Sequence, residues 1–146
     1  MMTTDAEELV NGLPLPSALV EAIQTGRWVA PLLHKLEAVF PLAADEGEPI
    51  CHPAFFDLDG MQRENDGWSE ETLPSYLGEK DDKVQPGDID PSQSIVIADL
   101  GPDRLVALDY RVSDENPRVV YLTGNQQPRW VEAAPNVESL MRLLGL

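Results

Sequence analysis

The sequence contains a single cysteine, Cys51, and few basic residues. One cysteine excludes an internal disulfide and is typical of a protein in a reducing compartment. The 10 Lys and Arg residues stand against 26 Asp and Glu residues, which gives a formal net charge of −16. Binding to phosphate groups needs Lys and Arg side chains that displace counterions, so we expect neither nucleic acid nor an anionic membrane as a direct partner. The charge favours a basic protein partner, or else it serves solubility alone.

Long apolar runs are also missing, and we expect no signal peptide. No stretch approaches the length that a membrane-spanning helix requires. The first ten residues, MMTTDAEELV, lack the basic region followed by an apolar run that marks a signal peptide, and we expect Met1–Gly12 to fray. We therefore predict a cytoplasmic protein. The 146 residues suffice for one domain, residues 1–146, and are too few for two ordinary ones.

Strand-like sequence is concentrated between Ser94 and Leu122. Three runs, Ser94–Asp99, Arg104–Arg111 and Pro117–Leu122, are rich in β-branched and apolar residues, and two short polar connections separate them. Such connections predict an antiparallel meander, because parallel strands need a long crossover. A fourth strand is expected at Arg129–Ala133 after a polar turn.

Alternation along the second run assigns its side chains to the two faces of the sheet. One face receives Val106, Leu108 and Tyr110, and the other receives Leu105, Ala107, Asp109 and Arg111. This pattern predicts one face against a core and one face that is partly wet. Asp109, Tyr110 and Arg111 could form a small functional site. We favour a structural role in which the tyrosine fills the core edge and the charged pair ties strands to neighbouring loops.

Helical patterns flank the strands. Leu15, Leu19 and Ile23 recur every four residues and predict a helix over Pro16–Thr25 that ends at Gly26. Trp28, which follows this helix, is expected to be buried in the core. Further helices are expected at Pro31–Phe40, where Leu32, Leu33, Leu36, Val39 and Phe40 form a broad apolar face, and at Phe55–Asn65.

The last helix has a clear beginning and end. Asn136 is its expected N-cap, Glu138 complements the helix dipole, and Gly145 stops it. Its buried stripe is Val137, Leu140, Met141 and Leu144. Together the elements predict an α+β fold: a single domain with an antiparallel β-sheet of about four or more strands, covered on one side by the N- and C-terminal helices.

The segment from Asp66 to Pro91 differs from the rest and is predicted to be a long acidic loop, at about residues 66–91. Between residues 45 and 90 there are fourteen carboxylates against three basic side chains. A loop of this length is usually functional or disordered, and like charges should keep it extended. Trp68 and Tyr76 lie within it, either as anchors folded back onto the core, which we favour slightly, or as contacts for a partner.

The central strands resemble the SUKH superfamily. The resemblance is carried by Ala107–Arg111 (ALDYR), preceded by Ile97–Gly101 and followed by Asn116–Val120, and it is supported by Leu15-Pro16, the Trp130 strand and the closing Leu143–Leu146. It does not extend over Asp45–Pro91. Many members carry an asparagine-glycine-glycine turn after the first helix, whereas this chain has Thr25-Gly26-Arg27-Trp28.

The resemblance implies a non-enzymatic immunity protein that binds and neutralises a toxin, often a nuclease. A fungal cell-wall regulator in the same group implies an alternative, a regulatory or scaffolding module with a housekeeping partner. On charge alone, because the resemblance does not cover them, the candidate partner-binding residues are Trp68, Glu70, Glu71, Tyr76, Glu79, Asp81, Asp82, Asp88 and Asp90. The oligomeric state stays open.

Catalytic and metal patterns are poorly supported. Cys51-His52 could pair as nucleophile and base, but we favour a buried thiol beside a surface imidazole. No zinc-ligand spacing occurs, and Asp57-Leu58-Asp59-Gly60 places glycine too early for a calcium loop, although a weak adventitious cation site stays open. Pairs of carboxylates for glycoside hydrolysis cannot be judged from sequence, because their separation is spatial. We therefore predict no enzyme, no cofactor and no metal.

Overall fold

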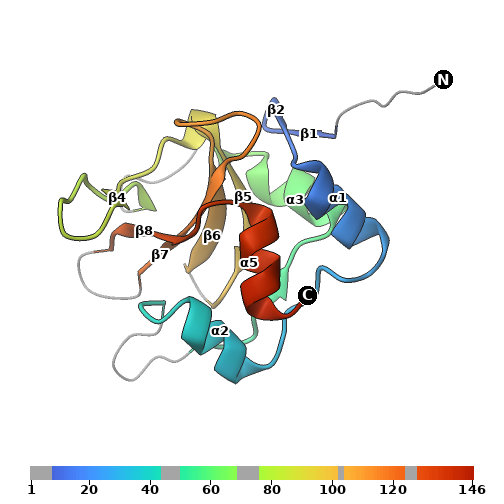
Figure 1. Cartoon of the computed structure of the whole chain (residues 1–146). Coiled ribbons are helices and arrows are strands. Elements are labelled where there is room, and N and C mark those ends of the chain that lie inside the picture. The colour runs from blue at the N-terminus through green and yellow to red at the C-terminus, as the bar shows by residue number, and fades with distance from the viewer. Residues whose placement is uncertain (1–7, 44–49, 69–75, 102–103, 124–127) are drawn as a thin grey trace.

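The computed structural model describes residues 8–43, 50–68, 76–101, 104–123 and 128–146. A six-stranded antiparallel sheet forms its centre, in the order β3-β5-β6-β7-β8-β4 (Figure 1). Its strands are β3 (Ala54–Phe55), β4 (Pro86–Gly87), β5 (Ser94–Asp99), β6 (Leu105–Asp109), β7 (Arg118–Leu122) and β8 (Trp130–Ala134). Because β5 to β8 are neighbours in chain order, the predicted meander and the α+β class are confirmed.

The described residues form four α-helices: α1 (Ser17–Gln24), α2 (Leu33–Val39), α3 (Leu58–Asn65) and α5 (Val137–Leu144). Helix α5 crosses the sheet and contacts β7 and β8, and both α1 and α2 pack against α5 (Figure 1). Helix α3 packs instead against β5. In the part of the chain that the structure describes, no helix is long and apolar enough to cross a membrane.

A short hairpin precedes α1, with strands β1 (Leu9–Val10) and β2 (Leu13–Pro14). Val10 is buried, and the Asn11 side chain donates hydrogen bonds to the carbonyls of Pro91 and Ser94, at 2.8 and 3.0 Å. The expectation that the N-terminus frays is therefore wrong for residues 8–12, because a contact distant in sequence holds them. Residues 1–7 lie outside the described part.

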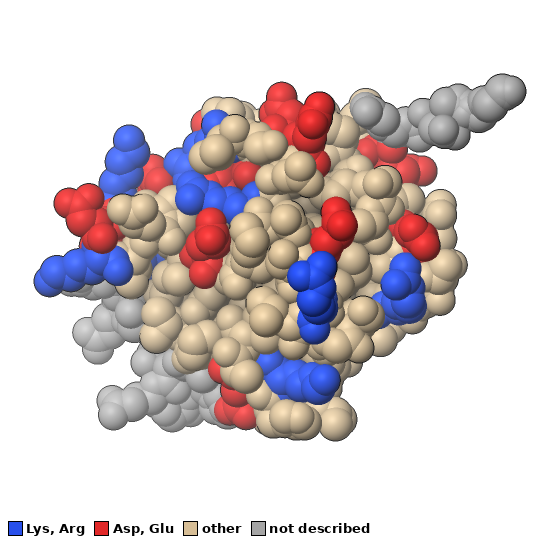
Figure 2. Space-filling view, in the orientation of Figure 1, with Lys and Arg blue, Asp and Glu red and all other residues tan. Residues whose placement is uncertain are grey.

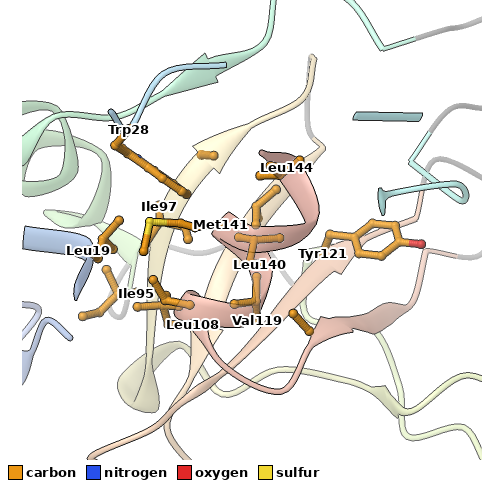
Figure 3. Close-up of a cluster of buried hydrophobic side chains, with 14 of the residues drawn as sticks. Leu19, Trp28, Ile95, Ile97, Leu108, Val119, Tyr121, Leu140, Met141 and Leu144 are labelled. Carbon is orange, nitrogen blue, oxygen red and sulfur yellow. The ribbon is translucent and has the colours of Figure 1, made fainter. Parts of the chain in front are cut away.

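The larger core lies between the helices and one face of the sheet. Val106, Leu108 and Tyr110 of β6 and its continuation point into it, as the alternation predicted. Trp28 is buried there too, with its ring 4.5 Å from that of Phe55. Figure 3 shows Leu140, Met141 and Leu144 of α5 against the strands, with Ile95, Ile97 and Leu108 on one side of the helix and Tyr121 on the other.

A second core lies on the opposite face of the sheet. It contains Trp68, Ile89, Val96, Ala107, Val120, Leu122 and Trp130, all of them buried. The prediction that this face is partly wet is therefore wrong over these positions. Residues 68 and 76–89, which belong to the predicted acidic loop, cover it.

The ends of α1 and α5 follow their sequence signals. Gly26 has a φ of +74°, in the left-handed region that glycine tolerates, just beyond α1. The Asn136 side-chain oxygen accepts a hydrogen bond from the Ser139 N–H at 2.8 Å, and Gly145 ends α5 with a φ of +76°. All four residues of the predicted α5 stripe are buried.

Helices α2 and α3 depart from the predictions. Leu36 and Phe40 of the α2 region are buried, but Leu32 and Leu33 are 70% and 46% exposed, so only part of the predicted apolar face is used. The third helix does not include Phe55, which pairs with Ala98 as part of β3. It begins instead at Leu58, after the Asp57 carboxylate caps it by accepting from the Gly60 N–H at 2.7 Å.

Asn65, at the end of α3, acts as a substitute for a strand neighbour of β5. Its buried amide accepts a hydrogen bond from the Val96 N–H and donates to the Val96 carbonyl, both at 2.8 Å. It also donates to the Met61 carbonyl at 2.8 Å. The bonds at Val96 coincide with the register shift between Val96 and Ala98 in the β5–β6 pairing. Asn65 thus satisfies backbone groups at an irregular point of the sheet.

We expect Asn65→Ala to lower the free energy of unfolding by about 2 kcal/mol, because the Val96 N–H and carbonyl would be buried without partners. Urea unfolding measures this cost. Gln62→Ala is the matched control on the same helix, since Gln62 makes one exposed hydrogen bond to the Leu9 carbonyl, and it should cost less than about 1 kcal/mol. Equal costs for the two variants would contradict the role given to Asn65.

Candidate partner-binding surface

Residues 76–91, called the arm from here on, fold back onto the sheet. Within the arm, the Ile89 N–H donates to the Leu77 carbonyl at 3.0 Å, and β4 pairs with β8 through Pro86–Val131 and Gly87–Trp130. The expectation that like charges keep the whole 66–91 segment extended is therefore wrong for the arm. Backbone pairing and burial of apolar side chains outweigh the charge repulsion there.

Two glycines allow the two sides of the arm to come together. Gly78 and Gly87 have φ values of +66° and +81°. A Cβ atom at Gly78 would collide with the Gly87 carbonyl oxygen, and one at Gly87 would collide with the Glu79 carbonyl oxygen. Only glycine combines the left-handed conformation with this close backbone approach.

Trp68 and Tyr76 anchor the arm, which is the role that we favoured for them. The Trp68 side chain is 6% exposed, and its indole N–H donates to the Ser94 hydroxyl at 2.8 Å. Its ring meets that of Trp130 edge to face, with centroids 6.2 Å apart. Tyr76 is half-buried, and its carbonyl accepts from the Trp130 indole N–H at 2.8 Å.

The predicted binding acids fall into three groups. Glu79 and Asp82 are exposed at the outer part of the arm, while Asp81 lies partly buried between them. Asp88 and Asp90, near the end of the arm that leads into β5, accept hydrogen bonds from Arg111 and from the Ser92 N–H, respectively. Glu70 and Glu71 lie outside the described residues.

Arginines offset part of the arm's acidity. Arg129 lies 3.5 Å from carboxylate oxygens of both Glu79 and Asp81, and Arg111 lies 3.0 Å from that of Asp88. The arm itself carries five acidic and two basic residues, a net charge of −3, and the two arginines, together with the buried Asp109 that Arg111 also binds, change the local sum to −2. The described arm is therefore less negative, once its neighbours in the fold are counted, than its sequence alone suggested.

Hydrogen bonds in and next to the arm lower the pKa values of two of its carboxyls. The Lys83 N–H, more than the nearby Arg129, lowers the pKa of Asp81 below its ordinary value. The Ser92 hydroxyl and N–H, at 2.7 and 2.9 Å, lower the pKa of Asp90, which caps the 3-10 turn η2 (Pro91–Gln93). Both side chains thus stay charged while holding the local backbone.

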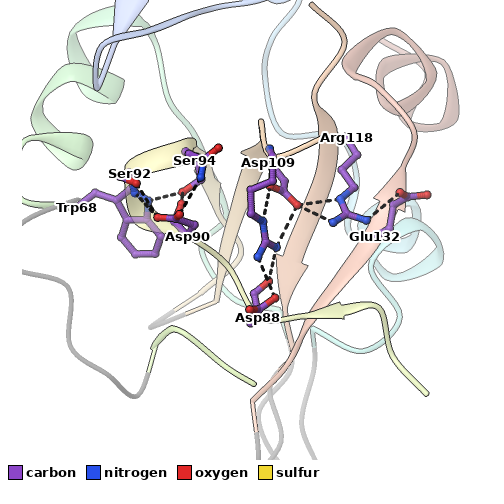
Figure 4. A network of polar contacts seen from close by, with 10 residues as sticks. Trp68, Asp88, Asp90, Ser92, Ser94, Asp109, Arg118 and Glu132 are labelled. Carbon is purple, nitrogen blue, oxygen red and sulfur yellow. Dashed lines mark hydrogen bonds and ion pairs between the residues drawn. The ribbon is translucent and has the colours of Figure 1, made fainter. Parts of the chain in front are cut away.

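A network of charged side chains joins the arm to the sheet (Figure 4). The fully buried Asp109 carboxylate accepts hydrogen bonds from Arg111 Nε at 3.0 Å and Arg118 Nε at 2.8 Å. Arg111 also donates to the Asp88 carboxylate at 3.0 Å and to its carbonyl at 2.9 Å. Arg118 extends toward Glu132 at 3.9 Å.

The contacts of Asp109, Tyr110 and Arg111 match the structural role that we favoured. Burial by itself would raise the pKa of Asp109, but the hydrogen bonds from Arg111, together with that from Arg118, lower it below its ordinary value. The Tyr110 hydroxyl donates to the Pro14 carbonyl at 2.6 Å, between β6 and the start of α1. These groups are committed to internal partners.

A model of the SMI1/KNR4 family (SUKH-1) matches residues 4–142. The chain belongs to this family. The match runs through residues 45–91, which the motifs recognised in the sequence did not reach. No curated protein and no solved structure matches the chain.

Membership of SUKH-1 fits the general kind of role that the resemblance implied. The family is known for immunity proteins, and its members are generally non-enzymatic proteins that act by binding other proteins. At the place of the family's asparagine-glycine-glycine turn, this chain has Thr25–Trp28, where Gly26 adopts a left-handed conformation with a φ of +74°.

Of the residues considered for catalysis and metal binding in this SUKH-1 chain, Cys51 differs from the prediction, whereas His52 lies at the surface as predicted. Cys51 is exposed rather than buried, and His52 beside it is also exposed, with a φ of +51°. Asp57 caps α3. Among the described residues, no group of three His, Cys, Asp or Glu side chains could hold a metal ion.

Proposed function

We propose that this chain is a non-enzymatic immunity protein that binds a protein toxin and neutralises it by occlusion. Membership of SUKH-1 over residues 4–142 is the observation that carries the proposal. The toxin would be a basic domain, such as a nuclease whose substrate groove attracts phosphate. An acidic protein with a net charge of −16 is steered toward such a groove and competes with nucleic acid for it.

The interface of this proposal includes the outward acids of the segment at 66–91. Glu79 and Asp82 are exposed on the arm, and Glu70 and Glu71 precede it in the sequence. Asp81, Asp88 and Asp90 support the arm through internal hydrogen bonds and ion pairs, so their contribution to binding would be partly indirect. Trp68 and Tyr76 would hold the arm against the sheet while its exposed acids, Glu79 and Asp82, contact the partner.

We expect the variant with Glu70→Gln, Glu71→Gln, Glu79→Gln and Asp82→Asn to associate with the toxin several-fold more slowly at low salt and to show a weaker salt dependence. Charges at the rim of an interface act mainly on the association rate. Surface plasmon resonance at low and high salt, with the basic partner purified from the native source, measures both quantities.

The matched control neutralises four exposed acids of α2, α3 and α5, all outside the 66–91 segment: Glu37, Asp59, Glu64 and Glu138. It changes the net charge by the same amount, so a similar slowing in both variants would show only the effect of total charge. Unchanged kinetics in the first variant would remove these acids from the interface. A partner from ordinary metabolism or envelope synthesis, instead of a toxin, would support the regulatory or scaffolding alternative.

A further inference from the structure

The strongest unassigned feature is an open groove of about 700 Å³ between the start of α1 and the β6–β7 connection. Pro14, Leu15, Pro16 and Val20 supply its apolar part. Among the described residues that line it, four are carboxylates and none is basic; the carboxylates are Glu8, Glu21, Asp114 and Glu115. In Figure 2 acidic side chains lie along the upper edge of the molecule, over the β6–β7 connection.

Internal hydrogen bonds hold the walls of the groove in place. The Leu15 N–H donates to the Glu8 carbonyl at 2.8 Å, which fixes the residue before β1 beside the start of α1. The Tyr110 hydroxyl reaches the Pro14 carbonyl and ties the sheet to the same wall. In the β6–β7 connection, the Ser113 hydroxyl accepts from the Asn116 N–H at 3.0 Å, so the turn that presents Asp114 and Glu115 is ordered.

The charge of this groove is less compensated than that of the arm. Glu21 lies 3.6 Å from Arg27, and both side chains are well exposed, so this pair is weak. Four carboxylates and this one arginine leave a local sum of −3, compared with −2 for the arm with Arg111, Arg129 and Asp109. Asp114, which lines the groove, also lies near the buried Tyr110, whose pKa is raised by burial first and by this carboxylate second.

The chemistry of the lining selects its occupant. The carboxylates attract a cation and repel phosphate, while the prolines, Leu15 and Val20 give apolar contact to a carbon chain. A second copy of this chain is a poor fit, because two molecules of net charge −16 repel each other. A segment of a basic protein with Lys or Arg next to an apolar side chain satisfies both parts of the lining.

We infer that this groove is a docking site for such a basic and apolar segment of the partner protein. The inference rests on the proposed function for the nature of the partner, and it places a binding surface outside the 66–91 segment. The groove lies at the β1–β2 and α1 side of the molecule, whereas the arm lies beside β8 (Figure 1). A partner that engages both would cover two separate surfaces.

A short peptide of alternating lysine and leucine residues tests the groove directly. We expect it to shift the backbone amide signals of Leu15, Val20, Glu21 and Asp114 in heteronuclear NMR spectra, and a peptide of alternating glutamate and leucine to leave them unchanged. Asp114→Asn with Glu115→Gln should raise the peptide Kd about five- to tenfold, because two attractive charges are lost. Glu37→Gln with Glu64→Gln is the control of equal charge and should leave the Kd within about twofold.

Shifts confined to other surfaces, or equal losses of affinity in the two double variants, would overturn the inference. Binding of the same variants to the purified basic partner distinguishes a failure of the groove inference from a failure of the proposed function. If the peptide binds in the groove but the partner is not a toxin, the docking site is supported and the immunity role is contradicted. If a toxin binds the Asp114 and Glu115 variant with unchanged affinity, and the peptide does not bind the wild-type protein, the immunity role is supported and the docking site is contradicted.

Discussion

Asp109→Asn should lower the free energy of unfolding by about 3–5 kcal/mol, the largest loss that we expect for a polar substitution in this protein. The Asp109 side chain is fully buried, and two arginines point at it. Removing its charge leaves Arg111 and Arg118, whose side chains are only 22% and 23% exposed, without their central counter-ion. Urea unfolding followed by circular dichroism measures the loss.

Glu132→Gln is the control at the edge of the same network. Glu132 is 45% exposed and its carboxylate lies 3.9 Å from Arg118, so the substitution should cost less than about 0.5 kcal/mol. A comparable cost at both positions would show that the stability comes from the total charge and not from the buried carboxylate.

The pH dependence provides an independent check on Asp109. Because its folded-state pKa lies below the unfolded value, its contribution is fully present above the unfolded pKa of about 4 and is lost as the pH falls toward the folded pKa. We therefore expect the stability difference between the wild type and Asp109→Asn to shrink as the pH is lowered from about 5 to about 3. A difference that stays constant over this range would contradict an ionised, arginine-bound Asp109.

Trp130→Ala should cost about 3–5 kcal/mol and should also loosen the arm. The Trp130 side chain is fully buried at the centre of the second core, where it contacts Trp68 and binds the Tyr76 carbonyl. Its loss leaves a cavity between β8 and the arm. Chemical unfolding gives the global cost, and hydrogen exchange at the Ile89 amide, which binds the Leu77 carbonyl, reports on the arm itself.

Trp130→Phe separates packing from hydrogen bonding at this position. The phenyl ring retains much of the packing but cannot donate to the Tyr76 carbonyl, so we expect a cost of about 1–2 kcal/mol and partial protection of the Ile89 amide. Full protection of that amide in the alanine variant would contradict the role of Trp130 as the anchor of the arm.

The central meander and the last helix could be predicted because their signals are local. Alternation from Leu105 to Asp109 assigns each side chain to a face, and the spacing from Val137 to Leu144 gives one buried stripe. Capping follows the same logic, since Asn136 contacts a residue three positions away. Short-range geometry of this kind needs no knowledge of the rest of the fold.

The arm and the N-terminal hairpin could not be predicted in this way. β4 has two residues and no alternation of its own, and it exists because Gly87 faces Trp130 of β8. Similarly, Asn11 is held by carbonyls about eighty positions along the chain. Composition indicated repulsion among the acids of the arm, but Arg111 and Arg129, from elsewhere in the sequence, compensate part of it.

The sequence by itself determined the α+β class, the antiparallel meander, the SUKH resemblance and the acidity that favours a basic protein partner. Only the tertiary structure decided which acids are held internally and which face outward. It also decided that Glu8, Asp114 and Glu115 line one groove with the start of α1. The physical reason is that periodicity and capping act over a few residues, whereas the field at a surface sums charges that folding brings together from distant parts of the chain.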